Sequence, residues 1–159
     1  MIDFLSNQTA YIDDVANMIY KEFVEKTSSK MTFLEVKKFF SNTKMDDFPI
    51  TLIALEDGKC IGTVSIFEND LKTQDLYKPW LASLYTKPEF RGKGVGQILI
   101  TETLKVVKDL GYKELYLRTE NAAEYYKNRG WVFIGNALDA KNEKVDIFKF
   151  DLKQEIGER

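Results

Sequence analysis

The chain has 159 residues, of which 44% are hydrophobic and 13% aromatic, so it is long and apolar enough to bury the core of one domain. Its 23 Lys and Arg residues nearly balance its 25 Asp and Glu residues, and no concentrated basic segment of the kind that binds nucleic acid is present. The absence of histidine excludes Ser-His and Cys-His catalysis, and one cysteine leaves a metal with almost no ligands except carboxylates. We therefore expect a single domain over residues 1–159 that binds no metal.

The first residues lack a basic segment followed by an apolar run, and no stretch approaches the roughly 20 apolar residues of a membrane span. The single cysteine, Cys60, has no partner for an internal disulfide, which suits a reducing compartment. It lies in a strand-like run, and we interpret it as a buried inert thiol rather than a nucleophile. We expect a cytoplasmic protein, a monomer or a homodimer, that binds neither nucleic acid nor membrane.

The N-terminal third predicts one strand and two helices. Residues 1–5 form a short strand, and residues 11–25 carry apolar side chains at the spacing of an amphipathic helix. Thr32 and Glu35 have the spacing of a capping box, so a second helix should begin there and run to about Phe40.

The middle of the chain predicts a hairpin and a buried strand. Two apolar runs, residues 50–55 and 59–67, flank the turn signal Asp57-Gly58. Residues 80–86 form a further strand, which Pro88 ends.

Helices and strands alternate in the C-terminal half. An amphipathic helix begins near Gly94 and ends before Gly111, which is placed for a left-handed cap. The remaining elements are a strand over 114–119, a helix over 122–129, and strands over 131–134 and 145–150. This order predicts a mixed α/β fold in three layers, a central sheet flanked by helices.

A glycine-rich turn, residues 91–96, joins the predicted strand to the long helix and carries Arg91 and Lys93. The first amides of a helix lack internal partners and lie at the positive end of its dipole, so this turn is suited to bind a phosphate group. A plain tight turn that uses glycine for its positive φ is the alternative.

Two common phosphate loops do not match this turn. A Walker A loop needs Ser or Thr after the lysine, whereas Gly94 follows Lys93. A dinucleotide fingerprint needs a third glycine where this chain has Gln97. A nucleotide-binding domain is therefore the weaker reading of the turn.

Residues 81–96 resemble the acetyl-CoA-binding motif of the GNAT superfamily of N-acetyltransferases, whose core Gln/Arg-x-x-Gly-x-Gly/Ala is matched by Arg91, Gly94 and Gly96. Residues 122–131, Ala-Ala-Glu-Tyr-Tyr-Lys-Asn-Arg-Gly-Trp, resemble a second family segment, the helix and following strand. The resemblance implies a mostly antiparallel sheet with splayed central strands, and transfer of acetyl from acetyl-CoA to an amine by direct attack in a ternary complex.

The resemblance also implies roles for residues. The pantetheine arm of coenzyme A would pair with the strand at Leu84, Tyr85 and Thr86, where a backbone N–H would polarise the thioester carbonyl. Tyr126 matches the tyrosine that faces the coenzyme A sulfur as general acid; packing alone is the alternative role. Thr119 stands where many members have a cofactor-contacting asparagine, and Asn121 is the nearest asparagine. The cofactor-binding set so implied is Leu84, Tyr85, Thr86, Arg91, Gly92, Lys93, Gly94, Val95, Gly96 and Asn121.

The acceptor amine must lose a proton before it attacks, and three carboxylates are candidates for the base: Glu22, Glu68 and Asp70. Glu22 and Glu68 are our first choices beside Tyr126. Asp70, Asp75 and Tyr77 could instead shape the acceptor pocket. Small-molecule amines and peptide amines both remain open as acceptors, and a non-catalytic coenzyme A-binding module or sensor is the alternative function.

Overall fold

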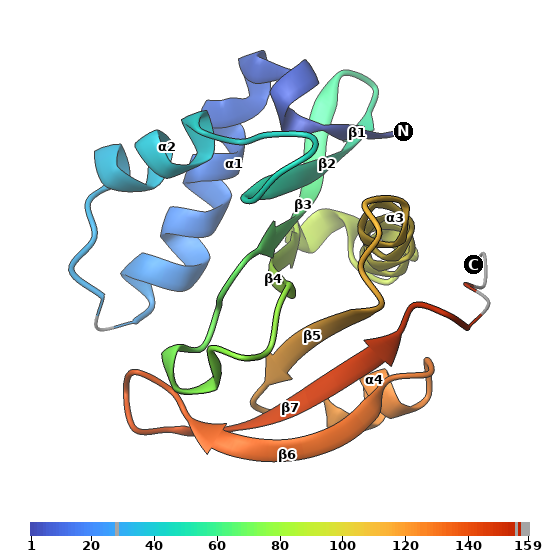
Figure 1. The fold of residues 1–159 in the computed structure, drawn as a ribbon. Helices are drawn as coiled ribbons and strands as arrows, with labels where there is room; N and C mark the ends of the chain where they lie inside the picture. Colours follow the sequence, from blue (N-terminus) through green and yellow to red (C-terminus); the bar gives the residue numbers. More distant parts are fainter. Residues whose placement is uncertain (28, 155, 157–159) are drawn as a thin grey trace.

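One mixed sheet of seven strands organises the part of the chain that the computed structural model describes, residues 1–27, 29–154 and 156. The strand order is β1-β2-β3-β4-β5-β7-β6 (Figure 1), and all neighbouring strands are antiparallel except β4 and β5. The expected mostly antiparallel sheet is therefore confirmed. The strands are β1 (Ile2–Phe4), β2 (Ile50–Glu56), β3 (Lys59–Phe67), β4 (Trp80–Thr86), β5 (Glu114–Thr119), β6 (Val132–Leu138) and β7 (Lys144–Asp151).

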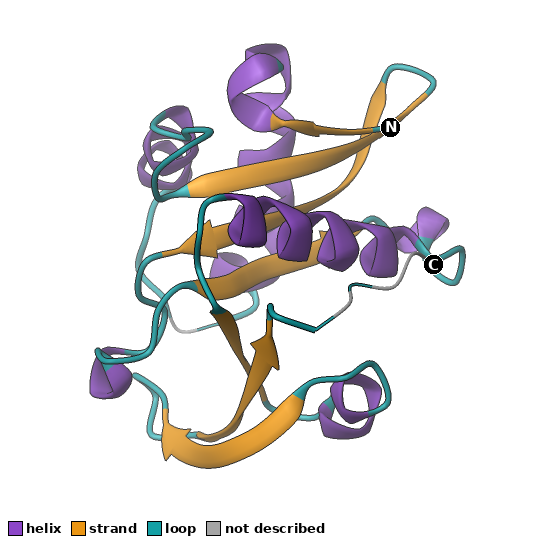
Figure 2. Cartoon of the chain, turned by 45° about the vertical axis from the view of Figure 1, so that its right-hand side comes forward, coloured by secondary structure: helices purple, strands orange, loops and turns teal. Residues whose placement is uncertain are grey.

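Helices cover both faces of this sheet, as the three-layer prediction requires. The helices α1 (Ile12–Ile19) and α2 (Phe33–Ser41) pack on one face of the N-terminal strands, and α3 (Val95–Asp109) packs on the other (Figure 1). The short helix α4 (Ala123–Lys127) lies beside the C-terminal strands. Figure 2 shows α3 lying against the sheet. Short 3-10 helices are η1 (Leu5–Asn7), η2 (Thr9–Tyr11), η4 (Lys72–Gln74) and η5 (Pro88–Phe90).

Side-chain alternation along β2 explains the two cores. Ile50, Leu52 and Ala54 pack in the cluster that contains the apolar side of α3. Ile53 and Leu55 point to the opposite face and pack with residues of α1 and α2. Successive side chains of a strand point to opposite faces, so a strand between two helical layers reads as a continuous apolar run.

Three local signals have the geometry expected from the sequence. The Thr32 hydroxyl accepts from the Glu35 backbone N–H at 3.1 Å, and the Glu35 carboxylate accepts from the Thr32 backbone N–H at 3.0 Å, which completes the capping box. Asp57 and Gly58 have φ values of 50° and 76°, as a two-residue hairpin turn requires. Gly111 has a φ of 96° just beyond α3.

Two elements differ from their predicted form. The helix expected over 11–25 is α-helical to Ile19 and then continues as a π-helical segment, η3 (Tyr20–Glu25). Strand β6 extends to Leu138, four residues beyond the expected end, because it pairs with β7 as far as Lys144. Asp139 then closes the hairpin, and its carboxylate accepts from the backbone N–H groups of Lys141 and Glu143 at 2.9 Å.

The sheet is interrupted between β4 and β5. These strands have a single registered pair, Trp80 with Tyr116, and beyond it they separate (Figure 1). The ring of Tyr77 stacks on Tyr116 with centroids 4.7 Å apart, which covers the junction from the face opposite α3. The expected splay of two central strands is therefore present.

No helix within the described ranges is long and apolar enough to span a lipid bilayer.

Candidate active site

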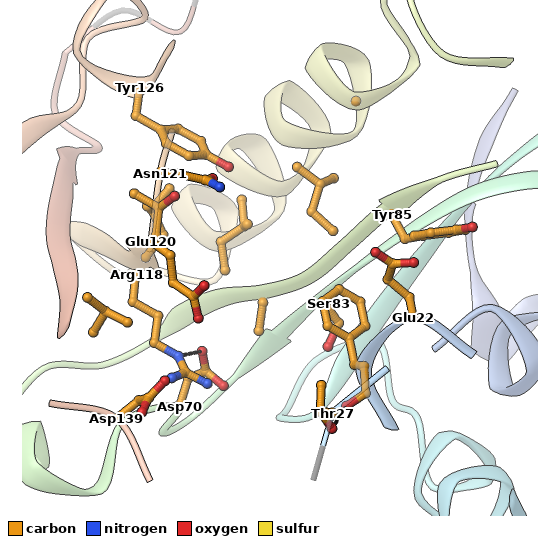
Figure 3. A pocket seen from close by; sticks show the side chains of 18 of the residues that line it. Glu22, Thr27, Asp70, Ser83, Tyr85, Arg118, Glu120, Asn121, Tyr126 and Asp139 are labelled. Carbon is orange, nitrogen blue, oxygen red and sulfur yellow. Dashed lines mark hydrogen bonds and ion pairs between the residues drawn. The ribbon is translucent and has the colours of Figure 1, made fainter. Parts of the chain in front are cut away.

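A cavity of about 860 Å³ opens where β4 and β5 separate. Its walls come from η3, β4, the start of α3, β5 with the segment that follows it, α4, and the turn between β6 and β7. Figure 3 shows Tyr126 and Asn121 at one end, and Asp70, Arg118 and Asp139 at the other. One continuous space thus joins two groups of polar side chains.

A β-bulge in β4 lies at the centre of this cavity. Ala82 pairs with Ser65 and Tyr85 pairs with Thr63, so Ser83 and Leu84 together oppose the single residue Val64. Ser83 has a φ of 53°, which is unusual for a residue other than glycine. Both bulge residues line the cavity, and a bulge turns backbone groups out of the ladder toward it.

The glycine-rich turn forms one end of the cavity. Gly92 and Gly94 have φ values of 78° and 84°, and Gly94 is the N-cap of α3. A Cβ atom on Gly96 would lie 3.9 Å from the Thr86 hydroxyl, on the surface that lines the cavity. The backbone at the start of α3 is therefore exposed to the cavity without a side chain in the way, which fits the pyrophosphate of coenzyme A.

Arg91 is held at the same end by β4. Its Nε donates to the Thr86 carbonyl at 2.8 Å, and its guanidinium lies 5.2 Å from the centroid of the Tyr85 ring. The side chain is thus fixed beside the turn, where its charge complements a phosphate.

The ten predicted cofactor-binding residues divide into two sets. Those that line the cavity are Leu84, Tyr85, Thr86, Arg91, Gly96 and Asn121. The other four, Gly92, Lys93, Gly94 and Val95, shape the turn without lining the cavity. The Lys93 ammonium lies 5.6 Å from the centroid of the Phe90 ring, and Val95 packs against the core.

Tyr126 lines the cavity from α4 and is half-buried. Its ring packs against Trp131, Phe148 and Tyr125, with centroids 5.9, 6.2 and 5.2 Å away. Burial, and next the neighbouring Tyr125, raise the pKa of the Tyr126 phenol to about 12. The hydroxyl is therefore a neutral hydrogen-bond donor at physiological pH.

The three candidate bases are placed differently. Glu22 lies on η3 and lines the cavity, and Lys26 Nζ is 2.8 Å from its carboxylate. The side chain of Glu68 lies outside the cavity lining, is 67% exposed and is 4.0 Å from Lys78 Nζ. Asp70 lines the cavity, and burial raises the pKa of its carboxyl above the ordinary value although Arg118 is adjacent. The structure brings Glu22, Asp70 and Tyr126 to one cavity, but not Glu68.

Asp75 and Tyr77 also lie outside the cavity lining. Asp75 is exposed, and Tyr77 packs on Tyr116 and Trp80 at the junction of the two strands. Of these three residues considered for pocket shape, only Asp70 faces the cavity.

The sequence reasoning missed Ser83, Arg118, Glu120 and Asp139, all of which line the cavity. The Arg118 Nε donates to Asp70 at 3.0 Å. No signal in the sequence pointed to Arg118, because the burial of Tyr116 on the same strand face and the separation of β4 and β5 are tertiary features. Asp139 has a lowered pKa, chiefly because its carboxylate accepts from the Glu143 backbone N–H. Carboxylate oxygens of Glu120, Asp139 and Glu143 lie within 4.8 Å of one another, so the part of the cavity near Asp139 is acidic.

Comparison with known proteins gives a consistent result. The model of the acetyltransferase (GNAT) family matches residues 12–131. The chain is 26% identical to N-alpha-acetyltransferase 30 of Schizosaccharomyces pombe over 135 residues, which is 82% of this chain and 84% of that protein.

Solved structures share the fold at low sequence identity. An aminoglycoside 6'-N-acetyltransferase complexed with coenzyme A superposes with a TM-score of 0.75 at 14% identity, over 98% of both chains. A spermidine N-acetyltransferase of Vibrio cholerae superposes with a TM-score of 0.73 at 16% identity, over 96% of this chain and 95% of that one. These identities are low enough that the likeness concerns the fold.

Proposed function

Because this chain belongs to the acetyltransferase (GNAT) family, we propose that it transfers the acetyl group of acetyl-CoA to the α-amine of a polypeptide, by direct attack within the cavity between β4 and β5. The family match supports the transfer of an acetyl group from acetyl-CoA to an amine. The acceptor class and the residue roles are the proposal. The observation that carries the mechanism is a single cavity lined by Arg91 and Gly96 of the glycine turn, by Tyr126, and by the carboxylates of Glu22 and Asp70.

The choice of an α-amine has two supports. The similar protein of S. pombe is named for acetylation of α-amines and aligns along most of both chains. The cavity is also lined by four carboxylates, Glu22, Asp70, Glu120 and Asp139, against the three cations Arg91, Arg118 and Lys141. An excess of carboxylates attracts the ammonium form of an amine, which predominates at neutral pH.

Acetyl-CoA supplies an acetyl group activated as a thioester. The backbone amides at the start of α3 and the Arg91 guanidinium bind the pyrophosphate. At the bulge, the backbone N–H of Leu84 or Tyr85 donates to the carbonyl oxygen that becomes negative as the amine attacks. These groups are fixed before the reaction, so they stabilise the developing charge without reorganisation.

Glu22 and Tyr126 act on opposite sides of the reacting carbon, Glu22 as a proton acceptor and Tyr126 as a hydrogen-bond donor. Glu22 accepts the ammonium proton of the acceptor, directly or through water. Tyr126 donates a hydrogen bond to the departing sulfur. Because its pKa is near 12 and that of a thiol is about 8.5, complete proton transfer from Tyr126 is uphill, so hydrogen bonding is its contribution.

The test combines ligand binding with turnover. Acetyl-CoA at about 100 times its dissociation constant should stabilise the native state by about 2.7 kcal/mol in thermal unfolding, while ATP and NADH should not. Release of free thiol from acetyl-CoA should then depend on an added peptide with a free N-terminus, and mass spectrometry should place the acetyl group on its α-amine.

The outcomes separate the candidate functions. Tight acetyl-CoA binding with no turnover on any amine would support the non-catalytic module instead. Turnover on diamines but not on peptides would retain acetyl transfer and reject the polypeptide acceptor.

A further inference from the structure

We propose that Arg118, held in place by Asp70, donates hydrogen bonds to the carbonyl oxygen next to the acceptor's α-amine, so that amide-linked residues are accepted and free amino acids are not. This inference rests on the proposed acetylation of α-amines. It adds a recognition site on the cavity wall opposite Glu22. This site would bind the neutral carbonyl group beside the reacting amine.

Strand register places Arg118 opposite the bulge of β4. The parallel strands are joined at Trp80 and Tyr116, and Arg118 is two residues beyond that joint on β5. On β4, two and three residues beyond it are Ala82 and the bulge residue Ser83. Arg118 therefore faces the bulge across the gap, and both Arg118 and Ser83 line the cavity.

The pairing with Asp70 orients the guanidinium but leaves donors free. The bond of 3.0 Å uses Nε, one of five N–H donors of an arginine. Within the described residues, no hydrogen bond donated by the terminal nitrogens of Arg118 is observed. The side chains of Arg118 and Asp70 are 33% and 18% exposed, so the pair is partly desolvated yet reachable from the cavity (Figure 3).

Charge balance decides which ligand suits these donors. Asp70 lies on one side of the guanidinium, and Asp139 is near enough for Arg118 to contribute to its lowered pKa (Figure 3). Glu120 lies at the same end of the cavity. A guanidinium already flanked by carboxylates can still donate to a neutral carbonyl oxygen, whereas the carboxylate of a free amino acid would meet net negative charge.

The competing explanation is that the Arg118–Asp70 pair only anchors the segment after β3 to β5. A structural pair would affect stability and all acceptors alike. A recognition pair would change the preference between acceptors that differ only in the group next to the amine.

The experiment uses three matched acceptors: the peptide best accepted in the screen, its first residue as a free amino acid, and the amine that keeps the side chain but lacks the carbonyl group. The measured quantity is the ratio of kcat/KM values within each protein. Comparing this ratio between the wild type and a variant cancels differences in intrinsic amine reactivity between the acceptors. The wild type should prefer the peptide to the free amino acid.

Arg118→Gln should lower the ratio of peptide to carbonyl-free amine about tenfold or more, the range for losing a hydrogen bond from a charged group. Arg118→Lys keeps the charge without the planar fork and should give a smaller loss in the same direction. Asp70→Asn removes one balancing charge and should raise the relative kcat/KM of the free amino acid.

The matched control is Lys149→Gln, because Lys149 also forms an ion pair with a β5 residue, Glu114 at 3.7 Å, but lies outside the cavity lining. It should leave all three ratios unchanged. Thermal unfolding and acetyl-CoA affinity show whether each variant is folded; if Arg118→Gln is not, Arg118→Lys and Asp70→Asn decide.

The inference is overturned if the wild type uses the free amino acid as well as the peptide, or if folded Arg118 variants keep the wild-type ratios. Acetyl transfer to peptides would stand in either case. A wild type that acetylates no amine would instead reject the proposed function itself.

Discussion

The phenol ring of Tyr126 packs edge-on against the indole of Trp131, with ring centroids 5.9 Å apart and planes at 71°. Phe148 contacts the same ring, with its centroid 6.2 Å away. The ring is thus fixed by aromatic packing, which a phenylalanine preserves.

Tyr126→Phe should therefore fold normally and lose only the hydrogen bond to the departing sulfur. We expect kcat to fall about tenfold to a hundredfold, with little change in the acetyl-CoA affinity or the melting temperature. Steady-state kinetics and thermal unfolding measure these quantities. Because the pKa of Tyr126 is raised to about 12, the phenol stays protonated, and its ionisation should cause no fall in kcat up to pH 10 or so.

Tyr125→Phe is the control for this substitution, since it removes a hydroxyl that donates to the Gln97 side chain at 3.2 Å. It should keep the wild-type kcat. Equal activity of Tyr126→Phe and wild type would reject a role for the Tyr126 hydroxyl and leave the ring as core packing.

Glu22→Gln should impair catalysis because the amide cannot take a proton from the acceptor. General-base groups contribute typically about 10²–10⁴-fold, so we expect kcat/KM for the amine to fall at least a hundredfold at neutral pH. The loss should shrink at high pH, where more of the acceptor is already neutral. Measuring kcat/KM for the amine between pH 6 and 10 tests both statements.

Glu68→Gln is the matched control, because Glu68 was predicted from the sequence as a base but its side chain is 67% exposed and outside the cavity lining. It should behave as the wild type. A larger effect at Glu68 than at Glu22 would reverse the assignment of the base.

Substitutions at two glycines of the turn should have different effects, one on the stability of the fold and the other on acetyl-CoA binding. Gly94→Ala places a side chain at a φ of 84° and should destabilise the fold by about 1–2 kcal/mol. Gly96→Ala meets no such strain and should leave stability unchanged or raise it by up to about 1 kcal/mol, since alanine favours helix. Its methyl group would stand on the cavity surface and weaken acetyl-CoA binding.

Denaturant unfolding and titration calorimetry measure the two effects. If Gly96→Ala bound acetyl-CoA as tightly as the wild type, the assignment of this turn to the pyrophosphate would be wrong. If Gly94→Ala were as stable as the wild type, the left-handed N-cap would not matter for folding.

Cys60 should be unreactive in the native protein. It is 1% exposed, and burial raises the pKa of its thiol to about 11. A disulfide reagent at pH 8 should titrate no thiol in buffer and one thiol in denaturant. Reaction of the native protein would contradict the burial of Cys60 and would complicate the thiol-release assay, for which Cys60→Ala is the remedy.

Local signals predicted much of this fold. Thr32 and Glu35 specify a capping box through their own side chains, and Asp57-Gly58 specifies a tight turn, so neither depends on distant residues. The glycine turn was predicted for the same reason.

Features that depend on tertiary contacts were not predicted. The π-helical segment keeps the apolar spacing of a helix, so periodicity does not reveal it. Glu68 and Asp70 are two residues apart after β3, and only the path of that segment decides that Asp70 meets Arg118. Arg118 itself becomes a candidate once the separation of β4 and β5 exposes it to the cavity.

The separation of β4 and β5 beyond Trp80 and Tyr116 has a consequence for how the cavity is assembled. Glu22, Leu84 and Arg91 belong to the N-terminal piece of the molecule, whereas Arg118, Asn121 and Tyr126 belong to the C-terminal piece. The residues proposed as base, oxyanion donor and phosphate contact therefore lie across the gap from Tyr126, and the core cluster that contains α3 includes strands from both sides. Core side chains packed around α3 thus hold the two sides of the cavity in register.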